Sequence, residues 1–255
     1  MKQGFVKVAS ATPRIRVADP VYNAQVICEQ AKEAAEHGAK IVVFPELCIT
    51  GYTCNDLFLQ ELLLEKAKEA LLTIAEETGQ LETLFLVGLP VDKDGRLYNV
   101  AAVLYRGRIL GMIPKKNIPM YAEFYEGRHF TPGEETVTEY RLGKQVIPFG
   151  SNLLFRCEEL PELILGCELC EDLWVAEPPS TSHALMGATV IANLSASNET
   201  VSKDDYRTLL IKASSARLLC GYIYTSAGEG ESTQDLVFGG HDLIAENGTL
   251  LVQSA

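Results

Sequence analysis

Three residues with the side chains needed for acyl-transfer chemistry each follow an apolar run typical of a buried strand. Cys170 follows the run at 162–167, and Glu46 and Lys115 follow two other such runs. Strand ends hold side chains in fixed positions, and the loops beyond them admit substrates. A thiol near neutral pH is mostly protonated, so a cysteine nucleophile needs a neighbouring base or a positive charge. Glu46 and Lys115 would supply both.

Glu46 and Lys115 would contribute in different ways. Burial of Glu46 would raise the pKa of its carboxyl group, which makes it a better proton acceptor near neutral pH. It could then take the thiol proton of Cys170 and later give it to a departing amine. A fixed ammonium at Lys115 would lower the pKa of the thiol and stabilise an oxyanion in acyl transfer. Pro114 and Pro119 bracket Lys115, which favours a rigid path for the chain there.

Each of these residues also has a purely structural interpretation. Cys170 could be an ordinary buried thiol, Glu46 a solvated loop carboxylate, and Lys115 half of a surface pair with Lys116. The context of Cys170 weighs against the first alternative, because two acidic residues and the single tryptophan, Trp174, follow it. The chemical interpretation therefore requires the three residues to lie together.

The spacing Cys167-x-x-Cys170 also suggests zinc or redox chemistry. A structural zinc site needs a second ligand pair, and Cys48 and Cys54 have no convincing histidine partner. A thioredoxin-like dithiol normally opens a helix, whereas strand residues run directly into Cys167 here. We therefore expect neither a metal site nor a redox-active dithiol.

Other catalytic templates are missing from the sequence. It contains no Gly-x-Ser-x-Gly elbow, no Gly-x-x-x-x-Gly-Lys-Ser/Thr phosphate loop and no His-Glu-x-x-His zinc helix. The acidic segment 228–233 lacks the third glycine of a dinucleotide fingerprint. The histidines share no metal-ligand spacing, so we interpret all four as structural or surface residues: His37, His129, His183 and His241.

The composition limits the partners and the compartment. The chain has 255 residues, 47% of them hydrophobic, and a formal net charge of -12. This length suits one domain with a large core, and the negative charge disfavours nucleic acid and anionic membranes. Seven cysteines in mostly apolar surroundings suit a reducing cytoplasm. No secretory signal or membrane-spanning run is present, so we expect a cytoplasmic protein that binds small molecules or other proteins.

Hydrophobic periodicity predicts four helices. Asp19 and Pro20 form a cap and first-turn pair for a helix that ends at Gly38. The other helices are predicted over residues 56–79, 178–187 and 202–220.

Strands are predicted between these helices, with hairpin turns at 106–107 and 247–248. The predicted strands cover residues 5–9, 39–44, 84–89, 98–105, 109–113, 162–167, 188–194, 222–225, 242–245 and 249–252. Residues 114–150 are predicted to be long and irregular, and their aromatic residues argue against disorder. The alternation predicts an α/β fold in a single domain, 1–255. A four-layer α-β-β-α sandwich fits this count, as does a three-layer sheet.

Three segments, taken together, resemble one known family. They are FPELCITGY at 44–52, PKKNIPMYAEFYE at 114–126 and ELCEDLW at 168–174. They resemble the glutamine-hydrolysing domain of bacterial glutamine-dependent NAD synthetases, within the nitrilase or carbon-nitrogen hydrolase superfamily. The resemblance continues through 193–198 and 238–241, so it covers nearly the whole chain.

The resemblance implies a nitrilase-like four-layer sandwich and a catalytic triad of Glu46, Lys115 and Cys170. It further implies hydrolysis of the glutamine side-chain amide through a cysteine thioester, giving glutamate and ammonia. The residues that it places around glutamine are Tyr121, Ser197, Lys203, Tyr52, Phe124 and Glu171. Lys203 lies past the matched motif, so it could instead belong only to the first turn of a helix.

The resemblance also implies partners outside these residues. Members of the family continue into an ATP-dependent synthetase domain with a Ser-Gly-Gly-x-Asp-Ser type loop, which this sequence lacks. We expect ATP and Mg²⁺ to act only in that domain, which would use the ammonia to make NAD⁺ from deamido-NAD⁺. We expect no cofactor in this domain, and we expect a homo-oligomer. The alternatives are a stand-alone amidase of the superfamily acting on another small amide, and a catalytically silent interaction module.

Overall fold

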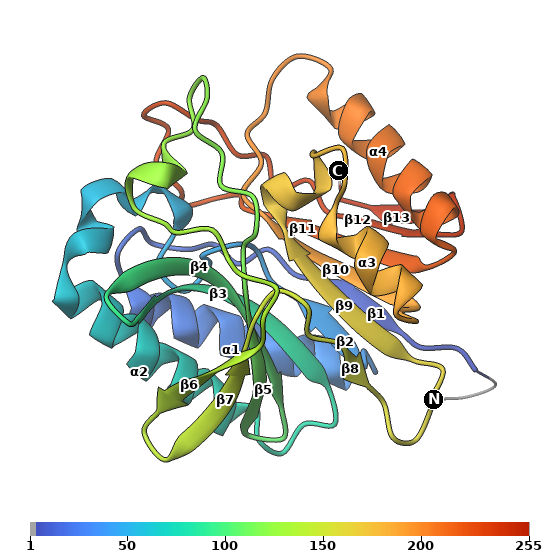
Figure 1. Ribbon diagram of the computed structural model, residues 1–255, viewed down its shortest axis with the longest axis horizontal. Helices are drawn as coiled ribbons and strands as arrows, with labels where there is room; N and C mark the ends of the chain where they lie inside the picture. Colours follow the sequence, from blue (N-terminus) through green and yellow to red (C-terminus); the bar gives the residue numbers. More distant parts are fainter. Residues whose placement is uncertain (1–3, 255) are drawn as a thin grey trace.

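Two β-sheets lie face to face at the centre of the computed structural model, which describes residues 4–254 (Figure 1). The first sheet has the order β1-β2-β3-β4-β5-β7-β6 and the second has the order β13-β12-β11-β10-β9-β8. The strands of the first sheet are β1 (Val8–Ser10), β2 (Ile41–Val43), β3 (Leu84–Lys93), β4 (Arg96–Tyr105), β5 (Arg108–Pro114), β6 (Thr138–Leu142) and β7 (Gln145–Phe149). Those of the second are β8 (Phe155–Arg156), β9 (Ile164–Leu169), β10 (Val190–Ser195), β11 (Gly221–Ser226), β12 (Leu243–Glu246) and β13 (Thr249–Gln253).

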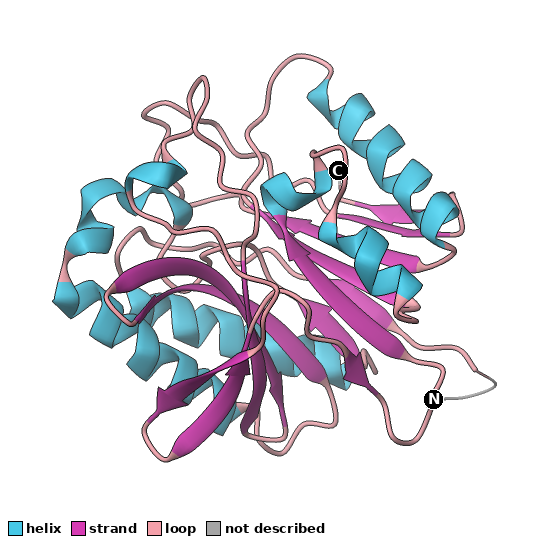
Figure 2. Cartoon of the chain, viewed as in Figure 1, coloured by secondary structure: helices cyan, strands magenta, loops and turns pink. Residues whose placement is uncertain are grey.

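Helices cover the outer face of each sheet (Figure 2). The α-helices are α1 (Pro20–Glu36), α2 (Glu61–Glu77), α3 (Pro179–Leu185) and α4 (Lys203–Leu218). Helices α1 and α2 lie on the first sheet, and α3 and α4 lie on the second. The layers therefore run α-β-β-α, so the predicted four-layer sandwich is confirmed and the three-layer alternative is wrong.

Three apolar cores hold the four layers together. The first packs α1 and α2 against the outer face of the first sheet, with Ile27 and Leu71 over Val42. The second lies between the sheets, where Val43 and Leu194 are buried. The third packs α4 against the second sheet, and α3 contacts β9 of the same sheet. The sheets bury both faces, which is why their strands read as uninterrupted apolar runs in the sequence.

The predicted start of α1 and both predicted hairpin turns are confirmed. The side chain of Asp19 accepts a hydrogen bond from the backbone N–H of Tyr22 at 3.1 Å, as expected of an N-cap. Positive φ values of 46° at Arg106 and 75° at Gly107 match a type I′ turn. The turn at 247–248 has the same character, with φ values of 47° and 86°.

Some predicted boundaries are wrong. The helix predicted over 56–79 is divided into a 3₁₀ segment η1 (Tyr52–Leu59) and α2, because Asn55 has a positive φ of 49° and Gln60 is extended. The segment 114–150 contains the hairpin β6–β7 and a short 3₁₀ turn, η2 (Glu126–Arg128). Alternating buried and exposed residues in β6 and β7 give a weaker sequence signal than the fully buried strands.

The strand predicted at 162–167 continues to Leu169 as β9, and the 3₁₀ turn η3 (Cys170–Leu173) follows directly. The reason is that Glu168, which looks like the first loop residue, is buried within the strand. Its carboxylate accepts hydrogen bonds from Tyr222 and from the backbone N–H of Ser180. The two-residue strand β8 pairs with β9 and was not predicted.

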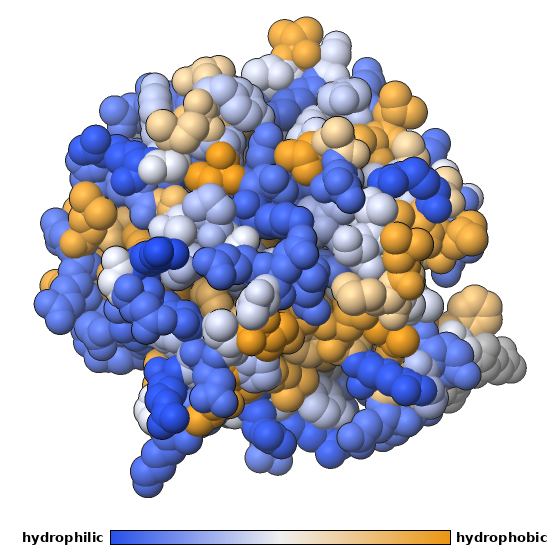
Figure 3. Space-filling model, in the orientation of Figure 1, coloured by the Kyte–Doolittle hydropathy of each residue, from blue (hydrophilic) through white to orange (hydrophobic). Residues whose placement is uncertain are grey.

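The surface agrees with the acidic composition. Figure 3 shows a largely hydrophilic face with scattered apolar patches. No helix between residues 4 and 254 has the length and apolar composition needed to cross a membrane.

Candidate active site

Cys170 occupies a strained position at the carboxyl end of β9. Its φ is 40°, in the left-handed region that residues other than glycine rarely adopt, and its side chain is 5% exposed. The carboxylate of Asp172 accepts hydrogen bonds from the N–H of Leu169 at 3.0 Å and from that of Asn117 at 2.8 Å. These bonds fix the turn beside the segment that follows Lys115. Strained residues held by their surroundings are concentrated at functional sites, so the thiol is a candidate nucleophile.

Glu46 is completely buried just beyond β2 and contacts both sheets. Its Oε2 accepts a hydrogen bond from the N–H of Ala196, which follows β10, at 2.9 Å. Its Oε1 accepts hydrogen bonds from Asn99 Nδ2 on β4 at 2.6 Å and from Lys115 Nζ at 2.7 Å. The carboxylate is therefore held in one orientation at the meeting point of the strand ends.

Lys115 is completely buried between two carboxylates. Its Nζ lies 2.7 Å from Glu46 and 2.6 Å from Oε1 of Glu126. Burial acts to lower the pKa of Lys115, but the charges of Glu126 and Glu46 outweigh burial and raise the pKa well above its usual value. Burial raises the pKa of Glu126 to about 7. Lys115 is consequently a fixed cation.

The surroundings keep the Cys170 thiol protonated at rest. Burial raises its pKa above the ordinary value, the charge of Glu46 raises it further, and the ammonium of Lys115 acts in the opposite direction. A thiol in this state needs a base to become a nucleophile. The nearby buried carboxylate of Glu46 can perform that step.

A cavity of about 480 Å³ opens onto Cys170. Five of the six residues that the family resemblance placed around the substrate line it: Tyr121, Phe124, Glu171, Ser197 and Lys203. Trp174, Asn198 and Glu123 complete much of the wall. The hydroxyl of Tyr121 lies 3.0 Å from both carboxylate oxygens of Glu171. The cavity wall next to the thiol thus carries both acidic and basic side chains.

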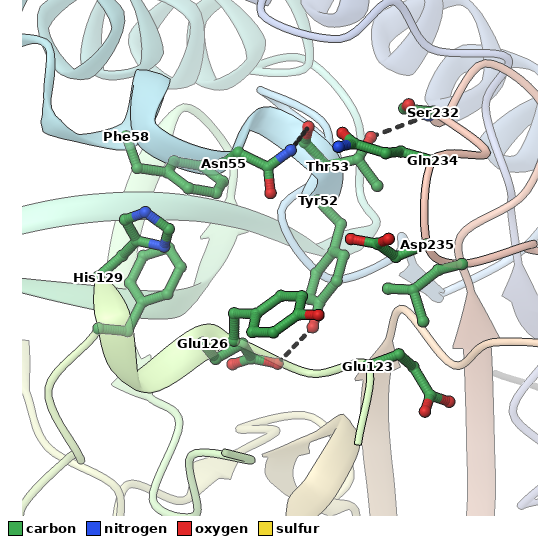
Figure 4. A pocket seen from close by; sticks show the side chains of 13 residues that line it. Tyr52, Thr53, Asn55, Phe58, Glu123, Glu126, His129, Ser232, Gln234 and Asp235 are labelled. Atoms are coloured by element: carbon green, nitrogen blue, oxygen red, sulfur yellow. Dashed lines mark hydrogen bonds between the residues drawn. The ribbon is translucent and has the colours of Figure 1, made fainter. Parts of the chain in front are cut away.

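Tyr52, the sixth residue, does not line this cavity. It lines a smaller cavity of about 50 Å³, and its hydroxyl donates a hydrogen bond to Glu126 Oε1 at 2.9 Å (Figure 4). Its contact with the site therefore passes through this carboxylate.

Lys203 is the first residue of α4, and its side chain extends over the cavity wall. The ammonium lies 5.3 Å from the ring centre of Trp174 and 5.8 Å from that of Phe124, within cation–π range. It donates a hydrogen bond to the side-chain oxygen of Asn198. Burial lowers the pKa of this ammonium, which is half-buried. Lys203 therefore belongs to the first turn of a helix and also lines the cavity, so the two interpretations of this residue are compatible.

Cys167 is separated from this chemistry by its position in the strand. It packs in the core between the sheets, and burial raises the pKa of its thiol well above the usual value. In residues 4–254 no group of three or more His, Cys, Asp and Glu side chains is arranged to hold a metal ion.

Sequence reasoning missed three residues that organise the site: Glu126, Asn99 and Asp172. Glu126 and Asp172 stood within the quoted motifs, and a buried role could have been suspected from their aromatic and apolar neighbours. Asn99 carried a clearer signal, because it is the polar residue in the otherwise apolar run 98–104.

Comparison with known proteins identifies the family. The carbon-nitrogen hydrolase family model matches residues 7–254. The chain belongs to the carbon-nitrogen hydrolase family. This is a family of enzymes, so the chain is an enzyme. The nitrilase-like fold agrees with the resemblance found in the motifs.

Among its relatives, this carbon-nitrogen hydrolase is 43% identical to the glutamine-dependent NAD(+) synthetase of Mycobacterium tuberculosis over 253 residues. The match covers 99% of this chain and 37% of that relative. The corresponding protein of Thermotoga maritima is 32% identical over 249 residues, covering 96% of this chain and 39% of the relative. The chain thus spans well under half the length of the curated relatives it matches.

Solved structures agree with this assignment. A glutamine-dependent NAD(+) synthetase from Cytophaga hutchinsonii superposes with a TM-score of 0.88 at 29% identity, covering 97% of this chain and 40% of that one. An amidase from Nesterenkonia sp. has a TM-score of 0.77 at 21% identity, covering 100% and 88%. The second likeness concerns the fold alone.

Proposed function

We propose that this chain hydrolyses the side-chain amide of glutamine to glutamate and ammonia. The observation that carries the proposal is the fully buried Glu46–Lys115–Glu126 cluster whose charges act on Cys170 at the cavity. Burying charged side chains costs free energy that the fold often does not recover in stability, so such a cluster points to a functional role. This cluster has both the base and the cation that a cysteine amidase needs.

Acylation begins at the neutral thiol. Glu46 takes the proton of Cys170 as the sulfur attacks the amide carbon, and the carbonyl oxygen becomes an oxyanion stabilised by Lys115 and nearby backbone N–H groups. Glu46 then returns the proton to the amide nitrogen, the carbon–nitrogen bond breaks, and ammonia leaves. A thioester with Cys170 remains.

Deacylation uses the same groups with water as the nucleophile. Glu46 takes a proton from water, the hydroxide attacks the thioester carbon, and Lys115 again stabilises the oxyanion. The carbon–sulfur bond breaks, and the sulfur of Cys170 recovers its proton from Glu46. One glutamine and one water give one glutamate and one ammonia.

The cavity walls suit the amino-acid end of glutamine. Lys203 offers a cation for the α-carboxylate and Glu171 an anion for the α-ammonium, while Ser197 and Tyr121 offer hydroxyl groups. Phe124 contributes an apolar surface for the methylene chain. Tyr52 supports the site through its hydrogen bond to Glu126.

The ammonia would feed NAD⁺ synthesis. The mycobacterial relatives are named glutamine-dependent NAD(+) synthetases and extend well beyond the matched region. We assign ATP and Mg²⁺ to a synthetase domain that converts deamido-NAD⁺ to NAD⁺, with no cofactor in this domain. We place the protein in the cytoplasm as a homo-oligomer. A stand-alone amidase remains the second candidate, because an amidase from Nesterenkonia sp. shares the fold across 88% of its own length.

Steady-state hydrolysis of glutamine and a panel of other ω-amides tests the proposal. We expect kcat/KM for glutamine to exceed that for each neutral aliphatic amide. Rapid quenching followed by mass spectrometry should show a glutamyl adduct on Cys170 that is lost in Cys170→Ala. Faster turnover of a neutral amide would favour the stand-alone amidase, and an adduct on Cys167 or Cys48 would refute the assigned nucleophile.

A further inference from the structure

Arg207, on α4, is the largest completely buried side chain within residues 4–254. Its guanidinium faces the segment that runs from β10 to α4. Nη2 donates hydrogen bonds to Ser197 Oγ and to the backbone oxygen of Asn198, both at 3.3 Å. Nη1 lies 2.9 Å from Oε1 of Glu199 and 2.8 Å from Nδ1 of His241. One side chain thus contacts three consecutive residues of the cavity segment.

The contact with His241 has a defined direction. A guanidinium has only donors, so Nδ1 of His241 must accept, and the imidazole is neutral with its proton on Nε2. Burial lowers the pKa of this imidazole, and the charge of Arg207 lowers it further. His241 therefore acts as a fixed acceptor that helps to orient the guanidinium.

Stability alone is a weak explanation for this arginine. Removing a guanidinium from water is costly, and buried ion pairs often contribute no more than an apolar replacement would. In addition, Nε of Arg207 is buried with no hydrogen-bond partner in the described part of the chain. A buried polar group without a hydrogen-bond partner requires an explanation, and a role in function is one.

The segment that Arg207 holds forms one wall of the cavity. Ser197 and Asn198 both line the cavity, whereas Arg207 does not. The side chain of Asn198 donates to Glu123 and accepts from Lys203, so it joins an acidic and a basic group of the wall. These contacts fix the spacing of the two charges.

Two residues of helix α4 contact this wall at different depths. Lys203 and Arg207 are four residues apart on the helix, so their side chains lie on the same face. Lys203 contacts the Asn198 side chain at the cavity, and Arg207 contacts the Asn198 backbone behind it. The carboxylate of Glu46 and the ammonium of Lys115 are held instead by the strand-end contacts described above.

We propose that Arg207 is a positioning residue for the wall that recognises the amino-acid head group, and that it sets selectivity for α-amino-acid amides over simple amides. It acts through Ser197, Asn198 and Lys203 without touching the substrate. This inference rests on the proposed glutaminase function and deepens it, since it names the residue on which head-group recognition depends.

The test compares two reagents that alkylate Cys170 in this 255-residue chain. One is an α-amino acid whose side chain ends in a diazo-ketone, which loses N₂ and forms a thioether with the thiol. The other is iodoacetamide, which has no amino-acid head group. For Arg207→Lys we expect the second-order rate with the diazo-ketone to fall about tenfold or more, because a buried charge-assisted contact is lost. The rate with iodoacetamide should change less than about twofold, since the acylating groups keep their contacts.

The control is Arg217→Lys, the same substitution on the exposed last turn of α4, which should leave both rates unchanged. Since Arg207→Lys could prevent folding, Glu199→Gln provides a second variant that perturbs the guanidinium from a partly exposed side chain. It should give the same selective loss at about threefold. An equal fall with both reagents, or no fall in either variant, would overturn the proposal. Failure of the diazo-ketone to label wild-type Cys170 would instead refute the proposed glutaminase function.

Discussion

The ammonium of Lys115 and the carboxylate of Glu46 form a completely buried ion pair, with Nζ 2.7 Å from Oε1. The carboxylate of Glu126 also lies beside this ammonium, so the cluster holds one cation between two acids. Such an arrangement is an expensive way to stabilise a fold. It is an effective way to hold a base and an oxyanion-stabilising cation beside one thiol.

Replacing Glu46 by glutamine should remove the base while keeping a side chain of the same size. We expect glutamine turnover to fall at least about a hundredfold, because positioned proton transfer contributes that much or more. Circular dichroism and a thermal melt should show that the variant is folded. The exposed residue Glu139, replaced in the same way, is the control and should retain full activity. A Glu46→Gln enzyme within about threefold of wild type would mean that another group takes the thiol proton.

Loss of the Tyr52 hydroxyl should shift the pH dependence of turnover. The hydroxyl donates to Glu126 and favours its charged form, so Tyr52→Phe should raise the pKa of Glu126 further above about 7. Protonation of Glu126 removes one of the two carboxylate charges that hold the Lys115 ammonium, so the acidic limb of the kcat profile should move to higher pH by up to about one unit. Tyr105→Phe, on β4, is the matched control. If Tyr52→Phe lowered the stability of the protein but left the acidic limb of the kcat profile unchanged, the role of Tyr52 would be structural only.

The positions of the three proposed catalytic residues were predictable because each follows a largely apolar strand within a contiguous motif. Lys115 and Cys170 directly follow β5 and β9, and Glu46 lies three residues beyond the end of β2. The layer order was consistent with the sequence but not determined by it. It depends on which sheet faces meet, and that is set by tertiary packing of strands such as β10 against β2.

The supporting residues could not be found in the same way. Asn99 lies in mid-strand and reaches Glu46 only because β4 and the β2 end meet in three dimensions. Arg207 lies in a helix with many charged residues, where a surface position was the natural expectation. Its burial follows from the path of residues 197–199 and 241, which no local pattern specifies.

Glu168 should make the stability of the fold depend on pH. Burial raises the pKa of its carboxyl group to about 7, above the value of about 4.3 expected in the unfolded chain. Between these two values the folded protein keeps a proton that the unfolded chain has released. The free energy of unfolding therefore falls as pH rises through this window, by on the order of 3 kcal/mol.

Urea unfolding of Glu168→Gln at pH values below, within and above this window tests the point. The variant cannot ionise at this position, so its free energy of unfolding should fall less with rising pH than that of wild type. Glu139→Gln, at an exposed carboxylate, should follow the wild-type dependence. Parallel curves for wild type and Glu168→Gln would show that Glu168 is already ionised at low pH.

Gly88 should not tolerate a larger residue, because it lies under the turn that presents Glu46. A Cβ at this position would lie 2.3 Å from the backbone nitrogen of Leu47 and 2.6 Å from the backbone oxygen of Pro45. Backbone atoms cannot move aside as a flexible side chain can, so Gly88→Ala should destabilise the protein by about 3 kcal/mol. It should also displace Glu46 and abolish turnover in whatever protein remains folded.

The matched control is Gly221→Ala on β11, where the nearest atom to a new Cβ is 3.7 Å away. Its free energy of unfolding, measured in urea, should stay within about 1 kcal/mol of wild type, with full turnover. Equal stability of the two variants would mean that the turn at residues 45–47 can shift away from β3. Full turnover in a stable Gly88→Ala protein would show that Glu46 tolerates that shift, which contradicts the close fit on which its role as a positioned base depends.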